Sequence, residues 1–350
     1  MASNKKKIVN ALFFVLVFGL TIYSVFKGED LKELFHTLTK ANPLYLVLGA
    51  ACVVFFIWGE SIIIHYILDT LSVRTRKRTC FMYSCIGFFF SCITPSASGG
   101  QPAQVYYMHR DEIPIPVSSL VLMIVTVAYK SVLVLTGLFL VVFQRGFIHH
   151  YLEGILPVFY LGIGLNVGFC LILLLLIFHP ALAKNMMLRC LSFLEKVHIL
   201  KKKQERRERL SASMDQYNAA SVYLKQHGGV MVRVLIITFL QRFALFFVTF
   251  LVYKTFHLKG TNSYDVVMLQ AAISISVDML PLPGGMGISE HLFLSIFAPV
   301  FGAAFLLPAM VLSRGLAYYV QLLLSAGVTM LAQIRLGEMK KKRTSYPANT

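Results

Sequence analysis

Six ionisable side chains interrupt the long apolar stretches of this 350-residue chain, three acids and three bases: Glu60, Lys130, Arg242, Asp278, Glu290 and Arg314. On insertion scales a charged side chain costs at least about 2.5 kcal/mol at the centre of a bilayer. The guanidinium fork matches phosphate oxygens, and a Lys adds a point charge. The three bases are therefore predicted to hold an anionic headgroup, and the three acids to meet a headgroup amine or to carry protons. The alternative is that acids and bases only neutralise one another.

Two broken segments lie inside apolar runs, one in each half of the chain. They read TPSASGGQP at residues 94–102 and PLPGGMGISE at residues 281–290. Pro and Gly pairs end a regular helix, and broken backbone in hydrocarbon must be buried in protein or line a wet cavity. Such paired interruptions point to a transporter's binding site; the alternative is two short loops between ordinary helices. The additional substrate-binding residues predicted here are Ser96, Ser98, Gly99, Gly100, Gln101, Gly284 and Gly285.

The elements that position these groups are predicted to be membrane-spanning helices. The chain is 57% hydrophobic and 14% charged, with a mean hydropathy of +0.70, whereas a soluble domain has about 25% charged residues. Runs such as residues 8–26 and 155–178 have the length that crosses a bilayer as a helix, and the period-2 pattern of barrel strands is absent. The composition predicts an all-α polytopic membrane protein with one transmembrane domain over residues 1–335.

Basic residues follow the expected sides of the membrane. Of the 33 Lys and Arg residues, the predicted topology puts 24 on the inner side, 6 on the outer side and 3 in the membrane. The positive-inside rule then predicts a plasma-membrane protein with both termini in the cytoplasm. Because the net charge of +17 is explained by this distribution, it does not indicate a nucleic-acid partner.

About six full spans and two re-entrant helical hairpins satisfy the charge pattern. Residues 81–108 enter and leave from the cytoplasmic side, and residues 265–300 from the outer side. Oppositely opening hairpins predict an inverted repeat. Its first half covers about 1–179, a basic cytoplasmic linker about 180–229 and its second half about 230–335, before a basic tail at 336–350.

The linker mixes apolar and basic residues, with eleven Lys or Arg between residues 180 and 233. This pattern predicts one or two surface helices lying on anionic lipids of the inner leaflet. A solvated linker that joins the two halves is an equal alternative.

Residue patterns for catalysis are absent from the sequence. Ser96, Ser98 and Ser289 have no His and Asp at a recognisable spacing, and no P-loop, dinucleotide fingerprint or zinc motif occurs. The six cysteines have no metal-ligand spacing and are expected to be small buried hydrophobes. We therefore expect no catalytic residue, metal or cofactor.

Both broken segments carry a family resemblance. The stretches PSASGGQP at residues 95–102, followed by Gln104, and LPLPGGMGISE at residues 280–290 resemble the signature turns of the lysylphosphatidylglycerol synthase/flippase membrane-domain family. The likeness covers about residues 5–335. It implies lipid translocation. Family members are linked to lysyl-phosphatidylglycerol and to other lipids, including polyprenyl-phosphate sugars, so the resemblance leaves the cargo open. No room is expected after the last span for the cytosolic aminoacyltransferase domain of the bifunctional members.

Three functions follow from these observations. The first is a flippase that moves a phospholipid with a charged headgroup between leaflets. The second is a membrane-embedded enzyme of the phosphatidylglycerol lysyltransferase type that uses the intramembrane acids. The third is a non-transporting partner of a separate lipid-modifying synthase. A homo-oligomer is compatible with each of them. Charges beside two opposed broken helices favour the flippase.

Overall fold

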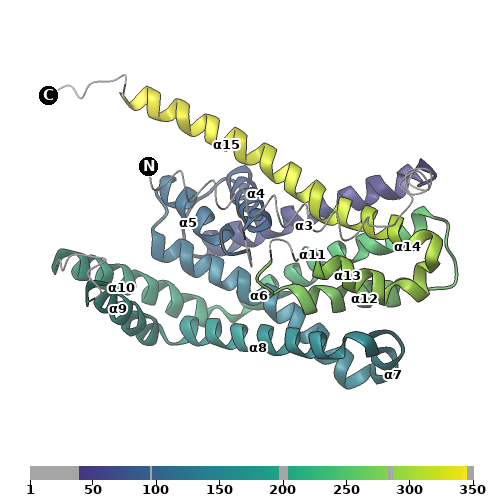
Figure 1. Cartoon of the computed structure of the whole chain (residues 1–350). Coiled ribbons are helices and arrows are strands. Elements are labelled where there is room, and N and C mark those ends of the chain that lie inside the picture. Colours follow the sequence, from purple (N-terminus) through teal and green to yellow (C-terminus); the bar gives the residue numbers. More distant parts are fainter. Residues whose placement is uncertain (1–38, 95–96, 197–203, 283–284, 286, 345–350) are drawn as a thin grey trace.

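The chain is helical throughout the part described by the computed structural model, which covers residues 39–94, 97–196, 204–282, 285 and 287–344. Its long apolar helices are α3 (Pro43–Thr70), α6 (Ile115–Phe143), α8 (Leu156–Phe178) and α11 (Gly228–Thr255) (Figure 1). They are followed by a run of α14 (Ala298–Arg314), η5 (Gly315–Val320) and α15 (Gln321–Thr344), which is kinked at Gly302. Each of these is long and apolar enough to cross a membrane. The predicted all-α polytopic architecture is confirmed, and the predicted first span at 8–26 lies outside the described residues.

An antiparallel pair, α3 and α11, forms the centre of the bundle. At one end Asn42 N donates to Thr255 O over 3.3 Å, and toward the other end Arg233 Nη1 donates to Tyr66 OH over 3.2 Å. Between these points the helices approach closely at Gly59, where an added Cβ would lie 2.2 Å from Gln241 Oε1. The close crossing brings the charged positions that follow, Glu60 and Arg242, into one layer.

The first broken segment is a helical hairpin of α4 (Lys77–Ile93) and α5 (Gly100–Arg110). Its two ends lie together, because Tyr83 OH hydrogen-bonds to the Asp111 carboxylate while Gln104 Nε2 donates to Tyr83 O over 3.2 Å. The chain thus enters and leaves at the same end of the bundle. Near the turn, Gly100 allows α5 to pack closely on α4, since a Cβ there would lie 2.7 Å from Gly87 O.

The second broken segment follows α11 and contains α12 (Ser263–Val277) and α13 (Ile288–Ile296), which pack against each other. Gly285 (φ 66°) and Gly287 (φ 86°) lie in the left-handed region, which favours glycine, so the turn uses its glycines for backbone shape. Since α3 and α11 are antiparallel and each precedes a hairpin, the two hairpins start from opposite ends of the bundle. This arrangement agrees with the predicted opposite orientation.

The linker between the halves consists of α9 (Pro180–Lys196) and α10 (Gln204–Gln226), which extend together at one end of the bundle (Figure 1). Helix α10 buries Met214, Tyr217, Ala220 and Leu224 in a hydrophobic cluster with residues of α6. The same face of α10 also satisfies two backbone carbonyls at the end of α8. Tyr217 OH donates to Leu176 O over 3.2 Å, and Ser221 Oγ donates to Ile177 O over 2.5 Å. Helix α10 is therefore packed on the protein through one face, while positions such as Asn218 and Val222 on its other face are exposed.

The connection between α6 and α8 is itself helical. It contains α7 (Arg145–Phe147), a π-helical turn (Ile148–Leu152) and a 3-10 turn (Glu153–Ile155). Ile148, Leu152 and Ile155 are buried in the same hydrophobic cluster as α12 residues. Burial of these three side chains explains why this short segment is folded on the bundle.

Candidate functional site

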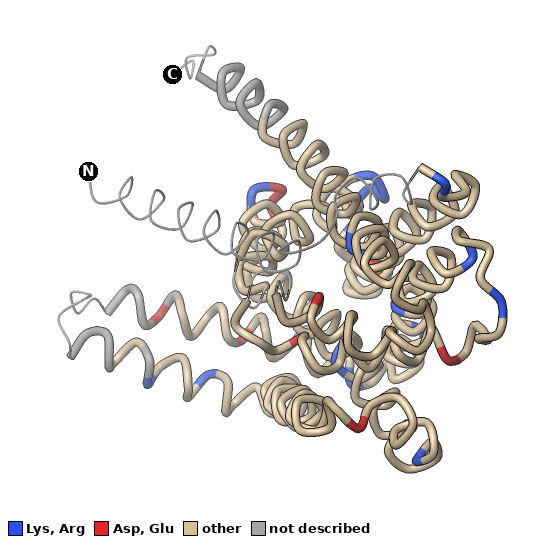
Figure 2. Tube along the Cα trace, turned by 45° about the vertical axis from the view of Figure 1, so that its right-hand side comes forward, with Lys and Arg blue, Asp and Glu red and all other residues tan. Residues whose placement is uncertain are grey.

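A cavity of about 600 Å³ lies between the turns of the two hairpins and helices α3, α6, α11 and η5. Figure 2 shows that the described trace is mostly uncharged, with basic and acidic positions at its loops and at a few points inside the bundle. The cavity collects several of these interior charges. The predicted residues that line it are Glu60, Ser98, Gln101, Lys130, Arg242, Asp278, Gly285 and Arg314.

Lys130, Arg242 and Asp278 form one cluster on the cavity wall. The Lys130 ammonium contacts Asp278 Oδ2, and Arg242 Nη2 lies 3.8 Å from Asp278 Oδ1. The exposed fractions of the Lys130 and Arg242 side chains are only 10% and 13%. Two cations therefore share one carboxylate in a mostly dehydrated place, and these three side chains together carry one positive charge when all are ionised.

Arg242 is held by aromatic rings rather than by hydrogen bonds. Its guanidinium carbon lies 4.7 Å from the ring centre of Tyr129 and 5.9 Å from that of Phe56. Among the described residues it makes no hydrogen bond, and its buried Nε has no acceptor. Cation–π contacts orient the guanidinium fork, and its Nη atoms make no hydrogen bond to the described residues.

Glu60 is the acid of α3 that faces this cluster. It is buried, and its two carboxylate oxygens accept hydrogen bonds from neutral groups. Gln104 Nε2 donates to Oε1 over 2.8 Å, and Tyr129 OH donates to Oε2 over 2.7 Å. Tyr129 thereby touches Glu60 with its hydroxyl and Arg242 with its ring face.

Glu290 and Arg314 form a separate pair in which Arg314 Nε donates to Glu290 Oε1 over 2.8 Å. The other carboxylate oxygen accepts from Gly287 N over 2.7 Å and Ser289 Oγ over 2.8 Å. Arg314 lines the cavity but Glu290 does not. Glu290 accepts the N–H of Gly287, the N-cap residue of α13, and so caps the start of its own helix.

Two further predicted residues that the structure describes, Gly99 and Gly100, do not line the cavity. Gly99 and Gly100 pack inside the first hairpin, where Gly99 N donates to Thr94 Oγ1 over 2.9 Å. Ser96 and Gly284 lie outside the described residues. These glycines shape the turn instead of presenting a surface to a ligand.

Several polar residues of the site were missed by sequence reasoning, among them Gln104, Tyr129, Gln270, Ser274 and Tyr318. Gln104 follows Gln101 by one helical turn, and Tyr129 precedes Lys130, so a search for polar residues in apolar runs would have found both. Tyr318 lies in the π-helical segment η5 and donates from its hydroxyl to Cys92 O over 2.9 Å. That bond connects the continuous helix after the second hairpin to the tip of the first.

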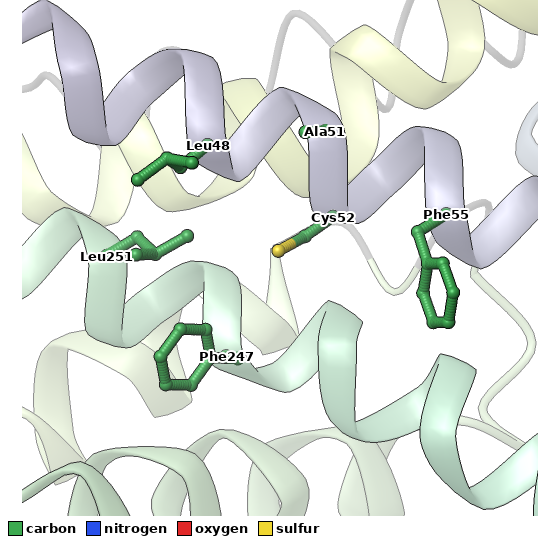
Figure 3. Close-up of a pocket in the computed structure, with 6 residues that line it drawn as sticks. All are labelled: Leu48, Ala51, Cys52, Phe55, Phe247 and Leu251. Atoms are coloured by element: carbon green, nitrogen blue, oxygen red, sulfur yellow. The ribbon is translucent and has the colours of Figure 1, made fainter.

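A second hollow of about 300 Å³ lies between α3 and α11 and is lined by apolar side chains and one thiol (Figure 3). Leu48, Cys52 and Phe55 contribute from α3, and Phe247 and Leu251 from α11. The next residue of α3, Phe56, lines the charged cavity instead. The two hollows therefore lie on different faces of the helix pair. In the described residues no group of three His, Cys, Asp or Glu side chains could hold a metal ion.

Long apolar helices around a buried charged cavity define a multi-pass membrane protein of all-α fold. The chain belongs to the family described as the lysylphosphatidylglycerol synthase TM region, whose family model matches residues 8–325. No curated protein matches the chain. The family connects the protein with a membrane lipid-related function.

Proposed function

We propose that the protein is a flippase that moves a lipid with a charged headgroup between the two leaflets. The candidate cargo is lysyl-phosphatidylglycerol or a related anionic or polyprenyl lipid. The observation that carries the proposal is Arg242, a guanidinium on the cavity wall without a hydrogen-bond acceptor among the described residues. An anionic headgroup supplies the acceptors that this guanidinium lacks.

The charge balance around Arg242 supports an anion as the ligand. Lys130 and Arg242 share the single carboxylate of Asp278, and in a dehydrated cavity an added negative charge interacts more strongly than in water. Glu60 lies across Tyr129 on the opposite side of this cluster. The headgroup would occupy the cavity while its acyl chains stay in the bilayer.

The two hairpins would act as alternating gates on either side of the headgroup. Ser98 and Gln101 from the first hairpin, and Asp278 and Gly285 from the second, line the cavity from opposite sides. In this proposal the halves at about 1–179 and 230–335 are inverted repeats that rock around a fixed site, as in other transporters with broken helices.

The surroundings of the protein form part of the same proposal. We place it in the plasma membrane with both termini in the cytoplasm. The basic linker then faces anionic lipids of the inner leaflet, and α9 exposes Leu182, Met186 and Met187 toward them. A separate synthase would supply a modified lipid, and a homo-oligomer is compatible with this arrangement.

The experiment that tests the function uses proteoliposomes containing the purified full chain. Fluorescent phosphatidylglycerol and its lysyl ester are followed between leaflets by the fraction protected from a membrane-impermeant quencher. We expect faster equilibration than in protein-free liposomes and at least a tenfold slower rate for Arg242→Gln. The matched control is Arg233→Gln, which removes a guanidinium from the same helix outside the cavity.

Each other outcome has a defined meaning. Equal rates with and without protein, for every anionic and aminoacylated lipid, would overturn the flippase proposal. Formation of the lysyl ester from charged tRNA by the chain alone would establish a lysyltransferase instead. Restoration of lipid transfer only after adding a synthase would establish a partner subunit.

A further inference from the structure

The three acids of the site differ in what neutralises them. Asp278 contacts Lys130 and Arg242, and Glu290 contacts Arg314. The Glu60 carboxylate accepts hydrogen bonds from the Gln104 amide and the Tyr129 hydroxyl. Within the described part of the chain, no Lys, Arg or His nitrogen lies within 4.0 Å of its carboxylate. Glu60 is thus a buried acid whose direct partners are neutral.

Protonation has a different consequence at each acid. A proton on Asp278 would remove the counter-charge of two buried cations, and a proton on Glu290 would remove that of Arg314. A proton on Glu60 breaks no ion pair. The Tyr129 hydroxyl can donate to the carboxylate or accept from the carboxylic acid, since a phenol has both capacities. The Glu60 pocket therefore accommodates both protonation states with one rotation of an O–H bond.

The groups that face Glu60 from the packed helices are neutral or cationic. Helix α4 contributes Ser84 and the Cys85 thiol, α5 the Gln104 amide, α6 the Tyr129 hydroxyl, and α11 the Arg242 guanidinium. Arg242 is the nearest charge among these described neighbours, and the ring of Tyr129 lies between it and Glu60.

The net charge of four side chains, the cluster of Lys130, Arg242 and Asp278 taken together with Glu60, depends on whether Glu60 is protonated. With Glu60 ionised, two acids (Glu60 and Asp278) balance two bases (Lys130 and Arg242). With Glu60 protonated, the same cluster carries one net positive charge. Because all four side chains line one cavity, that change acts directly on an anionic ligand. An anion and a proton on Glu60 therefore stabilise each other, and linkage makes this effect reciprocal.

Resting on the proposed flippase function, we propose that Glu60 takes up one proton when an anionic headgroup binds, so that headgroup and proton cross together. The proton comes from water, resides on the Glu60 carboxylate while the headgroup is bound, and leaves to water with headgroup release. A pH difference across the membrane then drives lipid movement toward the less acidic side. Headgroup affinity falls as the pH rises through the titration of Glu60.

The test counts protons on binding. Full-length protein in lipid nanodiscs is titrated calorimetrically with short-chain phosphatidylglycerol in two buffers of equal pH and different ionisation enthalpy. We expect uptake approaching one proton per headgroup in the parent and none in Glu60→Gln. The affinity of the parent should fall by at most about tenfold per pH unit, as for one linked proton, while that of Glu60→Gln stays flat. Asp215→Asn, at an exposed acid paired with Lys184 on the linker, should behave like the parent.

The experiment distinguishes failure of the proton inference from failure of the flippase proposal. Binding without proton uptake, or uptake retained in Glu60→Gln, overturns the proton inference and leaves the flippase proposal standing. Absence of binding at any pH overturns both. Should Glu60→Gln not fold, infrared difference spectra of the parent replace it. Addition of phosphatidylglycerol should then produce the band of a protonated carboxylic acid, shifted in Tyr129→Phe because that acid loses a hydrogen bond; absence of the band overturns the inference.

Discussion

Glu290 and Arg314 neutralise each other between the second hairpin and the helix that follows it, with Arg314 Nε donating to Glu290 Oε1 over 2.8 Å. The second oxygen of Glu290 is also used, by Gly287 N and Ser289 Oγ. Both oxygens of this carboxylate are thus used within the protein, and Glu290 does not line the cavity. The pair fixes the start of α13 against the end of α14, and the contrast with Arg242 separates structural from ligand-facing charges.

Glu290→Gln is expected to lower the free energy of unfolding by about 3–5 kcal/mol, because it removes the carboxylate charge from a buried ion pair. The measurement is denaturant unfolding of the purified protein in detergent. Glu290→Gln/Arg314→Gln should cost less than the sum of the single changes, with a coupling energy of about 0.5–3 kcal/mol. Additive costs would show that the two side chains do not act as a pair.

Arg242→Gln should behave in the opposite way and weaken ligand binding more than folding. Hydrogen bonds to a charged group contribute about 1.5–3 kcal/mol, so we expect affinity for short-chain phosphatidylglycerol to fall by about 10–150-fold. The unfolding midpoint should change little, because Arg242 makes no hydrogen bond to described residues. Arg233→Gln is the control on the same helix. A large loss of stability with unchanged affinity would make Arg242 a structural residue.

Gly59→Ala tests whether the close approach of α3 and α11 sets the cavity. A Cβ at Gly59 would lie 2.2 Å from Gln241 Oε1 and 2.9 Å from Gln241 Cβ, and overpacking of this kind costs about 1–3 kcal/mol. The expected result is a lower melting temperature and weaker headgroup binding, since Glu60 and Arg242 follow the two contact residues directly. Adding Gln241→Gly should restore part of both. Unchanged binding in Gly59→Ala would show that the crossing tolerates separation.

The sequence was sufficient for the architecture because the bilayer imposes strict rules. Charges in apolar runs are costly wherever they occur, and broken helices must line protein or a cavity. These rules identified Glu60, Lys130, Arg242 and Asp278 without any knowledge of contacts. They also predicted two hairpins that start from opposite ends of the bundle.

The pairing of the charges was beyond sequence reasoning. Lys130 and Asp278 are far apart in the chain and meet through the packing of α6 and α12, so no local spacing records the contact. The cap at Glu290 was hidden for another reason, because a carboxylate three residues into a helix serves equally well as a ligand site or as a cap. Only the direction of its oxygens, toward Gly287 N and Arg314, decides between them.

Ser221→Ala tests the attachment of the linker. Ser221 Oγ donates to Ile177 O at the end of α8, and both groups are buried. Loss of this hydrogen bond should cost about 1 kcal/mol and leave a carbonyl without its donor. We expect faster amide hydrogen exchange in α10 and at the end of α8, with little change elsewhere. Asn218→Ala, on the exposed side of α10, is the matched control; equal exchange in both variants would show that the bond does not hold the linker.

Single cysteines at the ends of both hairpins test their orientation in the membrane. Arg74 and His109 flank the first hairpin and are exposed, as are Lys259 and Ala303 around the second. If each hairpin is re-entrant, Arg74→Cys and His109→Cys react with a membrane-impermeant thiol reagent only from the cytoplasmic side. Lys259→Cys and Ala303→Cys react only from outside. The described native cysteines are buried or half-buried, and the parent protein measures their background. Labelling of Arg74→Cys and His109→Cys from opposite sides would mean that the segment between them crosses the membrane, and the inverted-repeat proposal would then fail together with its positive-inside assignment.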